Sequence, residues 1–146
     1  MKQIITLLVL VLTLNSCDLN DDCGECFTPP PEFNFKFVDK VTGEDLIYNG
    51  TVSLDNIEIK DEEDKIIDFE KHLINDEFII SVYSIGWELD AKTYTIYLSD
   101  TINVVFDLDM DTVSEDCCTF FEVKNFDVLD YEYEVDNYRG VIVVKI

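Results

Sequence analysis

Four of the five cysteines fall in two close pairs, and their thiols are the groups of this chain best suited to covalent or metal chemistry. Cys23 and Cys26 are separated by two residues, whereas Cys117 and Cys118 are adjacent. Thiols at such spacings form disulfides, exchange electrons in redox reactions or bind zinc. An even number of cysteines in an exported chain favours disulfides, and four cysteines allow three pairings.

A redox role for the first pair is disfavoured by the prolines that come after it. Cys23-Gly24-Glu25-Cys26 is superficially similar to the C-x-x-C motif of thioredoxin-type proteins. In that chemistry the first cysteine lies at a helix N-terminus, which lowers the pKa of its thiol. Pro29-Pro30-Pro31 lies closely downstream and prevents such a helix. We therefore expect no redox role for this motif.

Disulfides between the two pairs are the preferred arrangement. Adjacent cysteines bond to each other only with a strained peptide unit, because unstrained bridges need Cα atoms about 5.5 Å apart and neighbours are about 3.8 Å apart. We therefore expect Cys23 and Cys26 to pair with Cys117 and Cys118. Such a cross-link closes a loop of about 90 residues and is worth about 4 kcal/mol on the entropic model. A four-cysteine zinc site is the alternative.

An acidic run near residue 110 is the second candidate site. Its opening, D-L-D-M-D, resembles that of an EF-hand calcium loop, although Thr112 stands where the loop has glycine and Cys118 where it has glutamate. The candidate ligands are Asp107, Asp109, Asp111, Glu115 and Asp116. A strand explains the same spacing, since same-face residues about 6.8 Å apart are too distant to share one ion. Calcium would require the strand to end before Asp109.

Catalytic residues are scarce. His72 is the only histidine, and its neighbours Lys71 and Leu73 include no nucleophile. Paired acids suitable for glycoside hydrolysis occur throughout the chain, so they identify no site. We expect a protein that is not an enzyme.

The first 16 residues have the pattern of an export signal. Lys2 is followed by an uncharged apolar run over 4–14, which is too short to span a bilayer. Leu14-Asn15-Ser16-Cys17 then resembles the cleavage site of bacterial lipoproteins, with Asn15 as a departure from the commoner small residues. The resemblance implies cleavage before Cys17 and attachment of acyl chains to this cysteine, which would anchor the protein to a membrane.

The residues after Cys17 and the net charge indicate a destination. Asp18-Leu19-Asn20-Asp21-Asp22 resembles the acidic export signal of lipoproteins from Bacteroidota-type bacteria, which implies the outer face of the outer membrane. The formal net charge of the chain is −22, and it becomes −23 when Lys2 leaves with the signal. Such a surface excludes nucleic acid as a partner. Two short sequences around Thr101 and Thr112 are similar to the O-glycosylation signal of the same bacteria.

These groups are carried by one all-β domain after an extended tether. Strand-favouring Val, Ile, Thr, Phe, Tyr and Trp make up 58 of 146 residues, whereas alanine occurs once. Residues 1–16 form the signal, 17–32 a lipidated, acidic and Pro-rich tether, and 33–146 the domain. Segments alternate with the period of half-buried strands, beginning with Phe33, Phe35 and Phe37 on one face. Further strands are expected at 56–60, 77–85, 93–98, 102–110, 120–126, 129–135 and 141–146.

This pattern predicts an antiparallel β-sandwich, Ig-like or transthyretin-like. The D-x-x-T-G-E-x-L sequence at 39–46 is similar to the first hairpin of carboxypeptidase-regulatory, transthyretin-like modules. Residues 136–140 are expected to form the turn before the last strand. Residues 61–75 also fit an amphipathic helix with Asp61 as its N-cap, but we favour an acidic turn followed by a strand.

Two functions are consistent with these observations. The first is a lipid-anchored, non-enzymatic binding or structural accessory module of the envelope, whose partner is an unknown envelope protein or glycan. The second is a calcium-dependent adhesin or polysaccharide-binding subunit that uses the acidic run. No cofactor is expected apart from this possible calcium.

Overall fold

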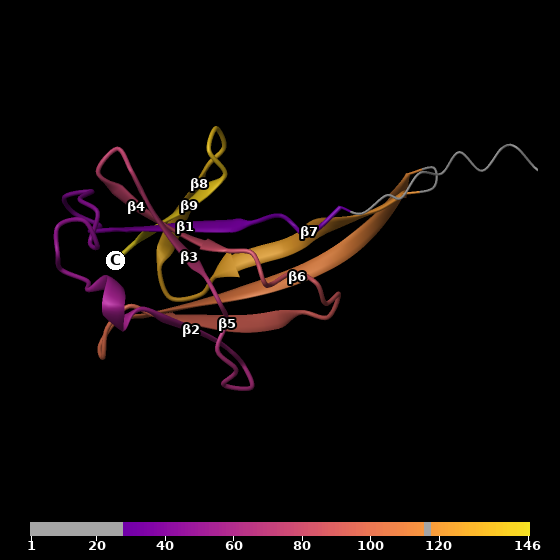
Figure 1. The fold of residues 1–146 in the computed structure, drawn as a ribbon, viewed down its shortest axis with the longest axis horizontal. Helices are drawn as coiled ribbons and strands as arrows, with labels where there is room; N and C mark the ends of the chain where they lie inside the picture. The colour runs from indigo at the N-terminus through magenta and orange to yellow at the C-terminus, as the bar shows by residue number, and fades with distance from the viewer. Residues whose placement is uncertain (1–27, 116–117) are drawn as a thin grey trace, which may run out of the picture.

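The computed structural model describes residues 28–115 and 118–146, which form two packed β-sheets (Figure 1). One sheet has the strand order β3-β4-β1-β9-β8, with bounds Glu70–Ile74, Glu77–Val82, Phe33–Val38, Val141–Lys145 and Glu132–Asp136. The other has the order β2-β5-β6-β7, with bounds Glu58–Asp61, Lys92–Tyr97, Asn103–Glu115 and Cys118–Val128. A short 3-10 helix, η1 (Leu54–Asn56), precedes β2. The predicted all-β sandwich is confirmed.

One pairing departs from the predicted antiparallel arrangement. β1 and β9 are parallel, with Phe35 opposite Ile142 and Phe37 opposite Val144, whereas the other described strand pairs are antiparallel. Parallel neighbours cannot be joined by a tight turn and need a long connection. Here that connection is nearly the whole domain, so no local turn signal in the sequence could reveal it.

The inward faces of both sheets meet in one core. Phe35 and Phe37 of β1 are fully buried, as is Phe106 of β6. The Phe35 and Phe106 ring centroids lie 5.0 Å apart, so the two sheets are in direct aromatic contact. Each such buried side chain contributes about 1.5–3 kcal/mol to folding. The face predicted for the β1 phenylalanines is therefore confirmed.

The β6–β7 hairpin is longer than predicted. β5 pairs with β6 only as far as Leu108. Beyond a register shift at Asp109/Met110, β6 and β7 continue as a two-stranded ribbon that projects from the sandwich (Figure 1). Inward burial of alternate residues ends at Met110. The hydrophobic alternation that predicts a strand therefore stops there, while backbone pairing continues to Glu115 and Cys118.

The segment 61–75 is a turn and a strand, so the helical interpretation is wrong and the favoured one is confirmed. The Asp61 carboxylate accepts hydrogen bonds from the N–H groups of Glu63 and Lys65, both at 2.9 Å, and these close a tight turn. Asn75 and Asp76 both have positive φ, as in the two-residue turns that join strands such as β3 and β4. The acids that imitate a helix start therefore serve turns.

The turn between β8 and β9 lies where it was predicted, and the strand before it is shorter than predicted. Asp136 and Gly140, with φ +66°, form the expected turn between β8 and β9. The strand predicted at 129–135 is shorter, because residues 129–131 lie in a turn before β8.

Within the expected tether, Pro30 is buried, and a Cβ built on Gly86 would lie 3.0 Å from the Pro30 Cβ. Among the described residues, no helix is long and apolar enough to cross a membrane.

Candidate functional site

The predicted cysteine site is only partly visible. Cys118 begins β7 opposite Glu115 at the end of the ribbon, and it takes part in a disulfide. The other candidates, Cys23, Cys26 and Cys117, lie outside the described residues, and so does the predicted lipidation site Cys17. The disulfide pairing and the lipidation therefore stay predictions.

The structure does not gather the acidic run into one site. Asp107, Asp109 and Asp111 occupy alternate positions of β6, which continues to Glu115, so the strand does not end before Asp109 as a calcium loop would require. Thr93 donates a 2.7 Å hydrogen bond to Asp107, and Lys124 forms a 3.0 Å ion pair with Asp109.

The other acids of this run do not complete such a site. Asp111 accepts a 2.7 Å hydrogen bond from the Thr112 N–H, and Asp116 lies outside the described residues. No group of three or more potential metal ligands forms within 28–115 and 118–146.

The two candidate glycosylation sites differ in their surroundings. Thr101 is exposed in the turn between β5 and β6, where its hydroxyl lies 3.4 Å from that of Ser99. Thr112 is partly buried within β6 and pairs with Phe121 of β7. A glycan needs an exposed loop, so only Thr101 meets this requirement.

His72 lies on β3, on the outer face of the five-stranded sheet. It lines a hollow together with Ser81 of β4, a hydroxyl that a histidine base could in principle activate. The Ser81 hydroxyl, however, donates to Asn34 Oδ1 at 2.6 Å, and His72 Nε2 faces Glu70 Oε2 at 3.4 Å. The hydrogen bond that would activate the serine is therefore missing from this arrangement.

The same outer face carries the densest ion-pair network of the described residues. Glu77 pairs with both Arg139 and Lys36, and Arg139 also bonds Asp136 through its Nε at 2.7 Å. Hydrogen bonds from Arg139 and Lys36 hold the pKa of Glu77 below its usual range. Each member already has a partner, which makes this network a brace between β4, β1 and the β8–β9 turn.

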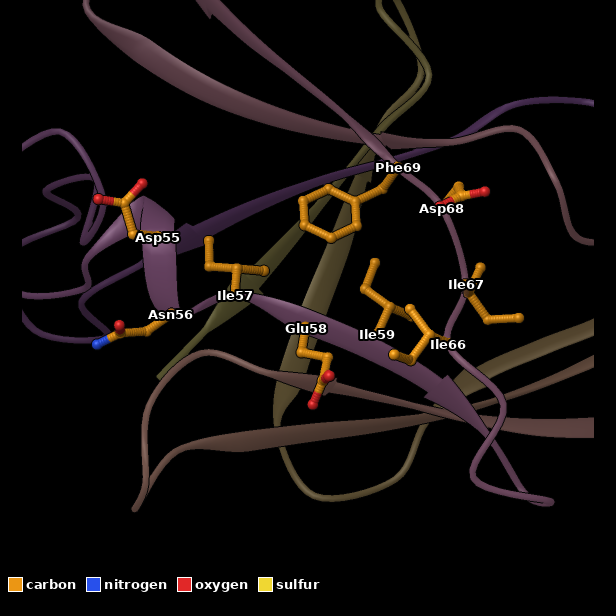
Figure 2. Close-up of a pocket in the computed structure, with 9 residues that line it drawn as sticks. All are labelled: Asp55, Asn56, Ile57, Glu58, Ile59, Ile66, Ile67, Asp68 and Phe69. Atoms are coloured by element: carbon orange, nitrogen blue, oxygen red, sulfur yellow. The ribbon is translucent and has the colours of Figure 1, made fainter.

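A groove at the open edge of the sandwich is a further candidate site (Figure 2). On one side it is lined by η1 and β2, and on the other by residues 66–69, which lead from the acidic turn toward β3. The Ile67 N–H donates to the Ile59 carbonyl at 2.9 Å, and a bridge joins Lys60 to Ile66. These backbone contacts hold the two walls together.

The groove has an acidic rim above side chains that mostly belong to the core. Its volume is about 440 Å³, and its apolar lining consists of Ile57, Ile59, Ile66, Ile67 and Phe69. Figure 2 shows the Phe69 ring and the Ile57 and Ile59 side chains directed into the same space, with Asp55 and Asp68 toward opposite ends. Asn56 and Glu58 complete the polar rim. Because most of the lining surface open to solvent is polar, the arrangement can hold a positive or hydrogen-bonding group beside the exposed Ile66.

The rim charges are only partly neutralised. Glu58 forms a 2.8 Å ion pair with Lys60, and the hydrogen bond between them raises the pKa of Lys60. Asp55 and Asp68 form no ion pair with any described residue. The Lys71 ammonium lies beside the groove, where it donates to the Leu54 carbonyl at 2.7 Å.

Sequence reasoning missed this groove. Ile57, which directly precedes β2, and Ile59 on β2 both face inward, and this alternation predicted a strand but no cavity. A local signal was the Ile66-Ile67 pair, because one of two adjacent apolar residues in an extended segment must face away from the core. Ile66 is indeed 62% exposed, whereas Ile67 is buried.

The chain matches no protein-family model, no curated protein and no solved structure. The resemblances in its N-terminal segment and in residues 39–46 therefore remain predictions.

Proposed function

We propose that the protein is a lipid-anchored, non-enzymatic binding module of the bacterial outer membrane, displayed at the cell surface. The observation that carries the binding role is the groove of Figure 2, where the exposed Ile66 lies beside the Asp55 and Asp68 carboxylates, which form no ion pair with any described residue. The lipoprotein-type signal ending at Cys17 supports the anchor. A β-sandwich on a tether would hold such a groove away from the lipid headgroups.

The tether also favours this role. From Cys17 to Phe33 the chain makes 16 steps, which span up to about 50 Å when fully extended. We infer that Cys23 and Cys26 pair with Cys117 and Cys118, which would fasten the tether to the β6–β7 ribbon. Intact masses before and after reduction would count the disulfides, and four free thiols would contradict this pairing.

The anchoring is tested by metabolic labelling. Labelled palmitate is expected to enter the wild-type protein and not Cys17→Ala, and the variant is expected to leave the membrane fraction. A variant that stays membrane-bound would exclude the lipid anchor at this residue. Protease added to intact cells should digest the domain, and full protection would contradict display at the surface.

A further inference from the structure

We propose that the groove binds a basic segment of a partner protein, with separate lysine or arginine heads at the Asp55 and Asp68 carboxylates and their methylene stems along the exposed Ile66 and the partly buried Phe69. This inference rests on the proposed binding function and names the chemistry of the partner. It differs from a metal site, because an ion without an apolar body would gain nothing from Ile66 and Phe69.

The acidic side chains that line the groove favour a positively charged ligand. The groove is lined by Asp55, Glu58 and Asp68 and by no cationic side chain. Only Glu58 is paired, and the whole chain carries a formal charge of −22. Clefts lined by one sign of charge concentrate ligands of the opposite sign and repel the others. An acidic segment or an anionic glycan would therefore be disfavoured here.

The apolar lining decides the shape of the occupant. Ile57, Ile59 and Ile67 belong to the core, so the apolar surface open to a ligand is that of Ile66, which is 62% exposed, and of the partly buried Phe69. Lysine and arginine bury their methylene stems along apolar surface while the charged head stays hydrated. A basic side chain can therefore cover Ile66 with its stem and leave its head at the acidic rim.

The protein itself provides a precedent at the same place. The Lys71 Nζ atom lies 5.4 Å from the centroid of the Phe69 ring and donates to the Leu54 carbonyl. Phe69 lines the groove, and Leu54 adjoins its Asp55. An ammonium group is thus already accommodated beside the groove by an aromatic face and a carbonyl oxygen. The Lys71 ammonium would also repel a second cation, so its removal tests whether the ligand is positively charged.

The test uses the full chain in neutral phosphatidylcholine nanodiscs and a fluorescein-labelled peptide in which three lysines alternate with isoleucine and alanine. Binding is followed by fluorescence anisotropy, and a peptide with glutamate in place of lysine serves as the charge control. The Asp55→Asn/Asp68→Asn double variant is expected to bind the lysine peptide about fivefold more weakly. Ile66→Ser is expected to lose about threefold, through the apolar contact alone.

A matched control separates the groove from the general acidity of the chain. Asp111→Asn/Glu122→Gln removes the same two charges from exposed positions that face each other on the β6–β7 ribbon. This variant should keep the wild-type affinity within about twofold. An equal loss in both double variants would overturn the proposal, because binding would then be nonspecific attraction.

The Lys71→Met variant tests whether the site prefers a positively charged ligand. The variant and the wild type are each measured at the same interval below their own melting temperature. Removal of this neighbouring cation should tighten the lysine peptide by about twofold. Weaker binding, or equal binding of the glutamate peptide, would refute a site for a basic segment. If the wild type binds neither peptide while palmitate labelling succeeds, this inference fails and the lipid anchor stands.

Discussion

We expect replacement of the Asp45 side chain, a carboxylate buried in the fold, to lower the free energy of unfolding strongly. It is 8% exposed, and its Oδ1 accepts the N–H groups of Ile47 and Tyr48, both at 2.9 Å. Its Oδ2 accepts the Phe78 N–H at 2.8 Å. Phe78 lies on β4 two residues from Ile80, where the ladder with β1 ends. The carboxylate therefore replaces β1 as the partner of β4 and fixes the connection that leads to η1.

The magnitude is set by the three donors. Asp45→Ala leaves the Ile47, Tyr48 and Phe78 N–H groups without their acceptor, and a buried unsatisfied donor costs about 1–3 kcal/mol. Water reaches the two partly buried donors, and the buried carboxylate no longer needs to be desolvated. We expect a net loss of about 3 kcal/mol in the free energy of unfolding, or roughly 10–15 °C in melting temperature.

The measurement is urea unfolding of the full chain, followed by the fluorescence of Trp87, the single tryptophan. Asp39→Ala is the matched control, since Asp39 accepts the Val41 and Thr42 N–H groups in an exposed turn of the same kind. Water can replace that carboxylate, so the control should lose much less stability. Equal losses at Asp39 and Asp45 would refute the view that burial sets the cost.

Three further predictions use the same measurement. Glu77→Gln should lower the free energy of unfolding by about 1–2 kcal/mol. Because the pKa of Glu77 is lower in the folded state, its contribution to stability is complete above the unfolded pKa and is lost as the pH falls through the folded pKa. The free energy of unfolding of the variant should therefore fall less steeply at acid pH than that of the wild type. Gly86→Ala should cost more than Gly140→Ala, since both have positive φ but only at Gly86 does a Cβ meet Pro30; equal costs would contradict the packing of Pro30. Neither millimolar calcium nor EDTA should change the melting temperature, and stabilisation by calcium would restore the acidic run as a site.

The sequence predicted those elements that local residue patterns specify. Alternation of Phe33, Phe35 and Phe37 marked β1, and the strands expected at 77–85 and 141–146 correspond to β4 and β9. Contacts between distant segments left no such trace. The parallel pairing of β1 with β9 joins the two ends of the domain, and nothing in either strand specifies its partner.

The groove was unpredictable for the same reason. Its walls meet through the Ile59 carbonyl and the Ile67 N–H, and the acidic turn between them has a length and a conformation that no periodicity encodes. Asp61 shows the ambiguity: a carboxylate followed by acids caps either a helix or a turn, and only the positive φ of Asp64 settles which one forms.

The acidity of the chain therefore has several distinct uses, and net charge alone identifies none of them. Asp39, Asp45 and Asp61 accept hydrogen bonds from backbone N–H groups in turns. Glu77 balances two of the few cations in a brace across the sheet. Asp55 and Asp68 serve neither purpose among the described residues, and they border the groove. The proposed basic partner depends on these two carboxylates and on the exposed Ile66 beside them, and not on the net charge of the chain.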